Sequence, residues 1–184
     1  VAYDQLLANH LALRLVRNQM RQARGYALKS SQMLRRQVQK KFSFKLTNSQ
    51  SIAVKEITAD MASKIRMHRL LQGDVGSGKT VVALAAMLVC ANDGYQVAMM
   101  APTEILAEHQ FLTIKRLLNA VSSDSKTPHE MHVSFGGEKN SFNIGFLVGS
   151  MRKREKQFLK EELVRGSIRI VIGTHALIQD DVKI

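Results

Sequence analysis

The segment from Gly73 to Thr80 constrains the fold of this chain more than any other. It is Gly-Asp-Val-Gly-Ser-Gly-Lys-Thr, and it lies between the apolar pair Leu70-Leu71 and the apolar run Val81-Val82-Ala83. A glycine-rich turn between a strand and a helix is the context in which G-x-x-x-x-G-K-T forms a phosphate-binding P-loop. The alternative is a glycine turn followed by a chance Lys-Thr. The matching strand and helix argue against it.

Each part of this loop has a chemical role. Glycines let the backbone approach a phosphate, so that successive N–H groups surround its oxygens. Lys79 is expected to neutralise the outer phosphates and Thr80 to supply a hydroxyl that helps hold Mg²⁺, which makes these two the candidate catalytic residues. We therefore predict a nucleoside-triphosphate site with Mg²⁺, formed by Gly73, Asp74, Gly76, Ser77, Gly78, Lys79 and Thr80.

Beyond residue 42 the pattern alternates between helices and short apolar strands, which predicts an α/β fold with a parallel sheet covered by helices. The expected strands are 68–72, 96–101, 144–148 and 168–172, and the expected helices are 48–65, 79–92, 104–119 and 151–165. Residues 122–143 are rich in Ser, Lys, Gly, His and Asn, and they are predicted to form a long surface insertion.

The first 41 residues follow a different pattern. Leucines and arginines at helical spacing predict a helix over 3–24 that ends at Gly25, and a second, basic helix is predicted over 27–41. The second helix has only a thin apolar stripe. Its basic face could contact DNA or simply be solvated, and the sequence leaves both open.

Charge and cysteine content narrow the class of protein. Lys plus Arg number 27 against 15 Asp plus Glu, a net charge of +12 that favours a polyanionic partner such as nucleic acid. A solvated basic surface is the alternative. Cys90 is the single cysteine, so no internal disulfide can form; we expect a reducing compartment and a buried thiol.

Several other kinds of site and segment are not expected. No apolar run is long enough to span a membrane, and no secretory signal opens the chain, which we expect to start inside a longer protein. Four histidines lie in separate segments without the spacing of metal ligands, so no structural metal site is predicted: His109, His129, His132 and His175.

Four further segments bear on which kind of P-loop protein this is. Gln50 offers an amide that suits an adenine edge, although Thr47 to Gln50 also has the spacing of a helix capping box. Thr103 stands where a strand passes into a helix, so it could bind a nucleic-acid phosphate or act as an ordinary cap. Ser150 and Thr174 follow strands in a similar way.

Together these segments resemble superfamily 2 helicases, and most closely the RecG-type branched-DNA helicases. Residues 73–80, 101–108 and 173–182 look like motifs I, Ia and Ib of that family, and 42–50 resembles its adenine-recognition motif. The resemblance implies a RecA-like motor domain with ATP and Mg²⁺ at Lys79 and Thr80. It further implies adenine near Phe44, Leu46 and Gln50, and DNA backbone near Thr103, Thr174 and His175; Ser150 is a third candidate backbone contact.

The resemblance also implies a domain layout and a function. Residues 1–41 would be a basic helical connector, and 42–184 the first part of motor domain 1, an incomplete domain. The expected activity is that of an ATP-dependent DNA helicase, monomeric, that remodels forks and junctions in DNA repair and recombination. A bacterial cytoplasm is the expected compartment, and an organellar homologue would also fit.

Up to Ile184, no Asp-Glu pair follows the P-loop. The acidic Walker B segment and a second motor lobe are therefore expected outside this chain, which alone should hydrolyse ATP hardly at all. Two alternatives stay open. One is a transcription-repair coupling translocase, whose P-loop usually has Phe where Ser77 stands here. The other is a non-catalytic basic nucleic-acid-binding module in which residues 1–41 dominate DNA contact.

Overall fold

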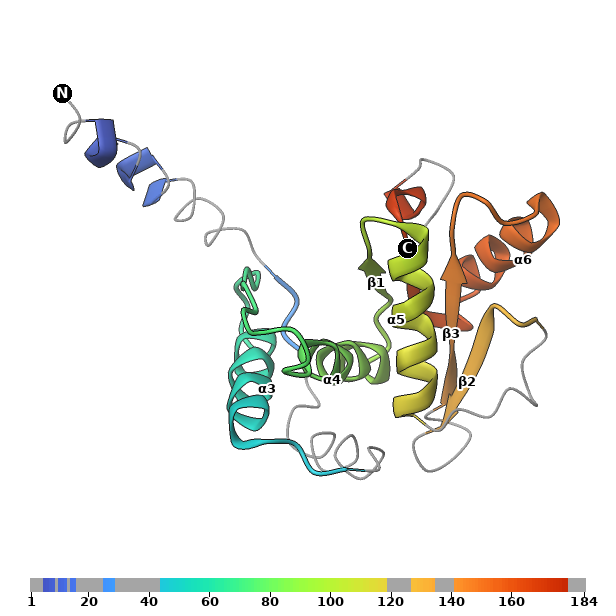
Figure 1. The fold of residues 1–184 in the computed structure, drawn as a ribbon, viewed down its shortest axis with the longest axis horizontal. Coiled ribbons are helices and arrows are strands. Elements are labelled where there is room, and N and C mark those ends of the chain that lie inside the picture. Colours follow the sequence, from blue (N-terminus) through green and yellow to red (C-terminus); the bar gives the residue numbers. More distant parts are fainter. Residues whose placement is uncertain are drawn as a thin grey trace.

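The computed structural model describes residues 5–8, 10–12, 14–15, 25–28, 44–118, 127–134 and 141–178. From residue 44 onward they form a four-stranded sheet with helices on both faces (Figure 1). The elements are α3 (Asn48–Met61), α4 (Lys79–Asn92), β1 (Val97–Met100), α5 (Glu104–Leu117), β2 (Glu130–Ser134), β3 (Ser141–Leu147), α6 (Lys153–Val164), β4 (Ile168–Gly173) and the short 3₁₀ helix η3 (His175–Ile178).

The strand order is β1-β4-β3-β2, so the last of these strands in the sequence lies between β1 and β3. β4 is parallel to both of its neighbours, whereas β2 is antiparallel to β3. Gly173 ends β4 where the backbones come very close: a Cβ on it would lie 2.0 Å from the carbonyl oxygen of Leu147. Because the three parallel strands end at one edge of the sheet, the loops that follow them are brought together there.

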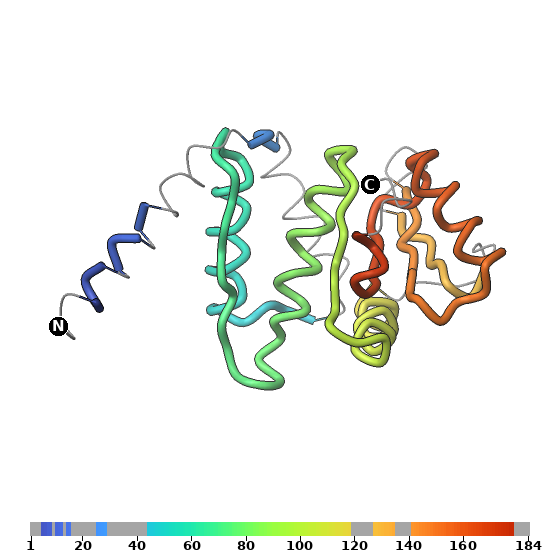
Figure 2. The backbone as a smooth tube through the Cα atoms, turned by 90° about the horizontal axis from the view of Figure 1, so that it is seen from above, coloured from blue at the N-terminus to red at the C-terminus, as the bar shows by residue number. Residues whose placement is uncertain are grey.

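The core has two layers because side chains of β4 alternate between the faces of the sheet. Ile170 and Ile172, both 0% exposed, face a cluster that includes Leu88 of α4. Val171 faces the opposite cluster with Leu159 of α6. Figure 2 shows this layering from above, with α3 and α4 on one side of the sheet and α6 on the other. Apolar burial on both faces makes β4 the centre of the packed structure.

The α/β class is confirmed, and the helix predicted over 79–92 is found with those bounds as α4. The helix predicted over 48–65 ends earlier, at Met61. Its C-cap is Ala62, and a turn follows in which the N–H of Ser63 donates to the carbonyl of Asp60 at 2.9 Å. The remaining helices and the strands at 96–101, 144–148 and 168–172 differ by at most a few residues at each end.

The surface insertion predicted over 122–143 is wrong for residues 130–134 and 141–143, which belong to strands of the sheet. Residues 130–134 form β2, which pairs antiparallel with β3 from Ser141 onward. Met131 and Val133 are buried on one face while His132 between them is not, a strand pattern too short to stand out among the polar residues around it. The sheet is therefore mixed, not wholly parallel. Residues 122–126 and 135–140 lie outside the described part of the chain.

The strand predicted over 68–72 is also wrong. These residues have no secondary structure, and none of the four strands of the described sheet includes them. The chain instead runs back alongside α3 before it turns into α4 (Figure 2). Arg69 holds it there: its guanidinium pairs with Asp60 at 2.5 Å and Glu56 at 2.6 Å. The hydrogen bond that Arg69 donates to Asp60, and after it the one to Glu56, raises the pKa of Arg69 above its ordinary value.

Only parts of the first 41 residues are described. Residues 5–8, 10–12 and 14–15 are helical, as predicted within 3–24. Residues 25–28 are not helical, so the helix predicted over 27–41 does not begin at Ala27; residues 29–41 lie outside the description. The N–H of Gly25 donates to the carbonyl of Lys64 at 2.7 Å and that of Leu28 to Met61 at 2.9 Å, which ties this segment to the end of α3.

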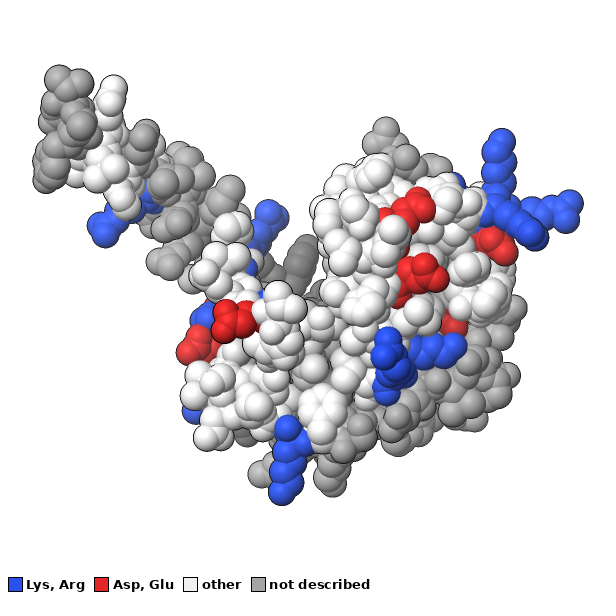
Figure 3. Space-filling model, in the orientation of Figure 1, with Lys and Arg blue, Asp and Glu red and all other residues white. Residues whose placement is uncertain are grey.

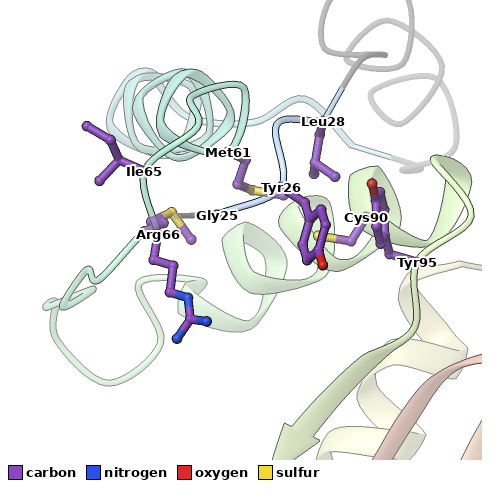
Figure 4. Close-up of a pocket in the computed structure, with 9 residues that line it drawn as sticks. Gly25, Tyr26, Leu28, Met61, Ile65, Arg66, Cys90 and Tyr95 are labelled. Atoms are coloured by element: carbon purple, nitrogen blue, oxygen red, sulfur yellow. The ribbon is translucent and has the colours of Figure 1, made fainter. Parts of the chain in front are cut away.

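A cavity of about 430 Å³ lies where residues 25–28 meet the ends of α3 and α4 (Figure 4). Tyr26 and Tyr95 line it with ring centroids 6.2 Å apart, and Cys90 lines it from α4. Cys90 is half-buried, less than predicted. Burial, followed by the negative charge of Asp93, raises the pKa of its thiol to about 11.

Within the described residues, no helix has both the length and the apolar character that crossing a membrane requires.

Cys90 should therefore react slowly with thiol reagents in the folded protein. A thiol with a pKa of about 11 holds on the order of a hundredfold less thiolate at pH 7.5 than an unperturbed cysteine, and the thiolate is the nucleophile. We expect the rate with a disulfide reagent to be lower by about that factor than in the denatured protein, and to rise with pH up to the thiol pKa. Equal reaction rates of Cys90 in the native and the denatured protein would contradict the raised thiol pKa.

Candidate nucleotide site and nucleic-acid interface

The P-loop is a tight turn that leads into α4. Gly76 and Gly78 both have φ of +83°, a left-handed conformation that side chains disfavour. Gly78 is the N-cap of α4 and offers no side-chain cap, so the first N–H groups of the helix are left without a side-chain partner. Backbone N–H groups at a helix start, with its positive dipole end, are suited to bind an anion.

Lys79 closes the loop from within. Its ammonium group donates to the carbonyl oxygens of Gly73 at 2.6 Å and of Asp74 at 2.7 Å. The charge therefore already lies over the loop, where the outer phosphates of a nucleotide could exchange for these carbonyls. The loop has little spare room, since a Cβ on Gly73 would lie 2.8 Å from the hydroxyl of Ser77. Its donors, an ammonium group, a hydroxyl and turn N–H groups, fit a magnesium-bound triphosphate.

Gln50 contacts the P-loop directly, which the sequence did not indicate. Its side-chain oxygen accepts from the N–H of Thr47 at 3.0 Å, and its own N–H donates to the hydroxyl of Thr47 at 3.3 Å, so the capping box is confirmed. Its side-chain nitrogen donates to the carbonyl of Ser77 at 2.9 Å. A Cβ on Gly78 would lie only 2.4 Å from that nitrogen. Because position 78 is glycine, Gln50 of α3 can come close enough to donate its hydrogen bond to the P-loop.

The predicted adenine contacts lie at the start of α3. Phe44 is 37% exposed, and Leu46 packs partly against the core. Both polar atoms of the Gln50 side chain already have partners in this arrangement, at Thr47 and Ser77. An adenine edge bound by Gln50 would therefore replace or share one of these two hydrogen bonds. The adenine contact itself stays a prediction.

Thr80 has a partner that the sequence did not identify. Its hydroxyl donates to the side-chain oxygen of Gln110 on α5 at 3.0 Å, in a partly buried position. Gln110 lies within the helix predicted over 104–119. The pattern predicted the helix but did not show which of its residues would face α4, because that depends on how the two helices pack.

The edge of the sheet gathers the predicted DNA contacts. Thr103 is the N-cap of α5 and accepts from the N–H of Leu106 at 3.3 Å, so its role as a cap is confirmed; its side chain is also exposed. Ser150 donates to the carboxylate of Glu104 through its N–H at 3.0 Å and its hydroxyl at 2.5 Å. The Ser150 hydroxyl is the main reason why the pKa of Glu104 lies below its ordinary value.

Thr174 and His175 differ in exposure. Thr174 is 2% exposed, and its carbonyl accepts from the N–H of Leu177 at 3.0 Å as η3 begins. His175 is exposed. The residues that reach solvent at this edge are therefore Thr103, Ser150 and His175, whereas the side chain of Thr174 lies inside the protein and could contact DNA only after a local rearrangement.

Positive charge lies beside Ser150. Arg152, Lys153 and Arg154 are consecutive and exposed at the start of α6, where Figure 3 shows a projecting group of basic side chains. Cations near a helix N-terminus are unfavourable because they oppose the helix dipole. A polyanion bound there would offset the unfavourable interaction of these cations with the helix dipole.

Within the described residues, no group of three His, Cys, Asp or Glu side chains is placed to hold a metal ion.

Comparisons with known proteins agree with this geometry. The model of the DEAD/DEAH box helicase family matches residues 47–183. ATP-dependent DNA helicase RecG of Aquifex aeolicus is 37% identical over 183 residues, which cover 100% of this chain and 21% of that protein. RecG of Staphylococcus epidermidis is 45% identical over 139 residues, 76% of this chain and 17% of that protein.

A solved structure of RecG bound to a three-way DNA junction superposes with a TM-score of 0.77 at 39% identity, covering 98% of this chain and 22% of that one. The chain spans about a fifth of the length of the curated relatives it matches. On the family match over most of its length and the RecG relatives, the chain belongs to the DEAD/DEAH box helicase family, and it is of the RecG type.

Proposed function

We propose that this chain forms the ATP-binding part of a DNA motor that remodels forks and recombination junctions in DNA repair. One observation carries the proposal: a P-loop with Lys79 and Thr80 in place is joined through one helix, α5, to the sheet edge with the candidate DNA contacts. The solved RecG relative, bound to a three-way junction, supports branched DNA as the substrate class.

In the proposed nucleotide site, each group has a different role. Turn N–H groups of the P-loop hold the phosphates, Lys79 balances their charge, and the Thr80 hydroxyl is a ligand for Mg²⁺. Phe44, Leu46 and Gln50 are the adenine contacts in this proposal. When bound, ATP with Mg²⁺ supplies a phosphoanhydride bond whose hydrolysis releases the free energy for movement. The chain's own groups position and neutralise the triphosphate.

On the DNA side, Thr103, Ser150 and His175 offer polar groups at one edge, and Arg152 to Arg154 add charge beside them. Contacts of this kind bind phosphates, so they position a protein on DNA without reading its sequence. A motor that moves along many sequences needs this property. We further propose that the protein works as a monomer. We also propose a bacterial cytoplasm as its compartment, since the relatives are bacterial proteins.

Replacing the P-loop lysine tests the motor. Lys79→Ala removes the charge that faces the phosphates. In the intact natural protein it should lower fork-stimulated ATP turnover by roughly 100-fold or more, as loss of one preorganised electrostatic contact does. Lys55→Ala is the matched control, because it removes the same charge from an exposed position on α3. Turnover that is indifferent to Lys79→Ala would instead support a non-catalytic binding module.

Neutralising the start of α6 tests the DNA-binding edge. The double change Lys153→Gln with Arg154→Gln should weaken DNA binding and reduce the slope of log affinity against log salt by up to about 1.8, since each lost phosphate contact removes about 0.9. The control pair is Lys55→Gln with Lys64→Gln, which removes equal charge from exposed positions near α3. If both pairs lower the slope equally, net charge and not this edge governs binding.

A further inference from the structure

A hydrogen bond between two residues that are 30 positions apart in the chain joins α4 to α5: the Thr80 hydroxyl donates to the Gln110 side-chain oxygen at 3.0 Å. Its direction matters chemically. A threonine hydroxyl has one hydrogen and two acceptor lone pairs, and a metal ion uses only the lone pairs. With the hydrogen directed to Gln110, the lone pairs are left for a cation on the other side.

The partner also selects the rotamer. In a helix a threonine side chain divides between two χ1 rotamers, because its hydroxyl can turn back to bond a backbone carbonyl. Thr80 lies in the first turn of α4, and here its hydroxyl bonds Gln110. A fixed acceptor on α5 therefore holds the hydroxyl in one orientation before any ligand arrives, so less side-chain entropy is lost when a ligand binds.

Gln110 is itself held in place. Ala107 and Ile114, three residues before and four residues after it, are both 0% exposed, so this face of α5 is packed into the core. Thr103 caps the start of the helix, and Glu104 accepts two hydrogen bonds from Ser150. The acceptor that faces Thr80 is thus carried by a helix that is fixed along its length.

We propose that Gln110 is a positioning residue for the magnesium ion of bound nucleotide: it accepts the Thr80 proton and so directs the Thr80 lone pairs to the metal. The inference rests on the proposed nucleotide site. In this proposal Gln110 is not itself a ligand of the metal and acts through Thr80. Partners that orient metal ligands in this way typically change metal affinity by about 10-fold to 100-fold when removed.

The test compares two substitutions at position 110. Gln110→Met keeps the length and helix propensity but has no strong acceptor, whereas Gln110→Glu keeps an acceptor oxygen. Glu108→Met is the control on the same helix, since Glu108 is exposed. Binding of a fluorescent ATP analogue is measured with EDTA and at increasing Mg²⁺, and thermal unfolding is recorded for each variant.

We expect Gln110→Met to raise the Mg²⁺ midpoint of binding by about 10-fold or more, with binding in EDTA unchanged. Gln110→Glu should return the midpoint to, or below, the wild-type value, and Glu108→Met should leave it unchanged. A merely structural role would weaken binding equally with and without Mg²⁺. That result, or a wild-type Mg²⁺ midpoint for Gln110→Met, overturns the proposal.

A second background keeps the test decisive if Gln110→Met unfolds more readily. In Thr80→Ser, which keeps the hydroxyl, Gln110→Met should still raise the Mg²⁺ midpoint. In Thr80→Val, which lacks it, the same change should have no further effect on that midpoint. A wild-type chain that binds the analogue no better than Lys79→Ala would instead overturn the nucleotide site itself, which separates failure of the proposed function from failure of this inference.

Discussion

The pairing of β4 with β1 on one side and β3 on the other is the interaction on which the rest of the structure depends. It is parallel on both sides, so three strands end at one edge and deliver their loops to the same place. The strand is buried on both faces, and its last residue, Gly173, must lie against the carbonyl of Leu147. Any side chain at Gly173 would separate the strands where the loops with the candidate DNA contacts begin, so the constraint on the fold is also a constraint on the candidate site.

Local patterns were enough to predict most of the helices and three of the four sheet strands. The glycine turn with apolar flanks identified the P-loop and α4 because phosphate binding needs that backbone and that helix start together. The pattern at 68–72 predicted extended chain but not its partner: pairing is a tertiary property, and an exposed ion pair of Arg69 with Asp60 and Glu56 holds this segment on α3 instead. Conversely, the short alternation in β2 was hidden among polar residues, although β3 gives it a complete antiparallel partner.

In the candidate site, too, local patterns predicted some features, whereas others depend on tertiary packing. Lys79 and Thr80 could be named from the motif because the chemistry of a triphosphate dictates those groups at that spacing. The partners Gln50 to Ser77 and Thr80 to Gln110 are separated by 27 and 30 residues, so they depend on how helices pack and no local pattern contains them. Burial is equally hard to read from a motif: Thr174 and His175 are neighbours in one segment, yet only His175 reaches solvent. Sequence therefore predicted the chemistry of the loop better than the network that supports it.

The strand order β1-β4-β3-β2 has a consequence for how the chain is made. β4 is the last of these strands to be synthesised, yet it lies between strands that are made before it. Until its residues leave the ribosome, β1 and the β2–β3 hairpin have no strand to join them, and the apolar residues of α4 and α6 lack the part of their packing surface that β4 provides. The nascent chain thus exposes two unfinished half-cores, which close together only when the sequence from Ile168 to Gly173 emerges.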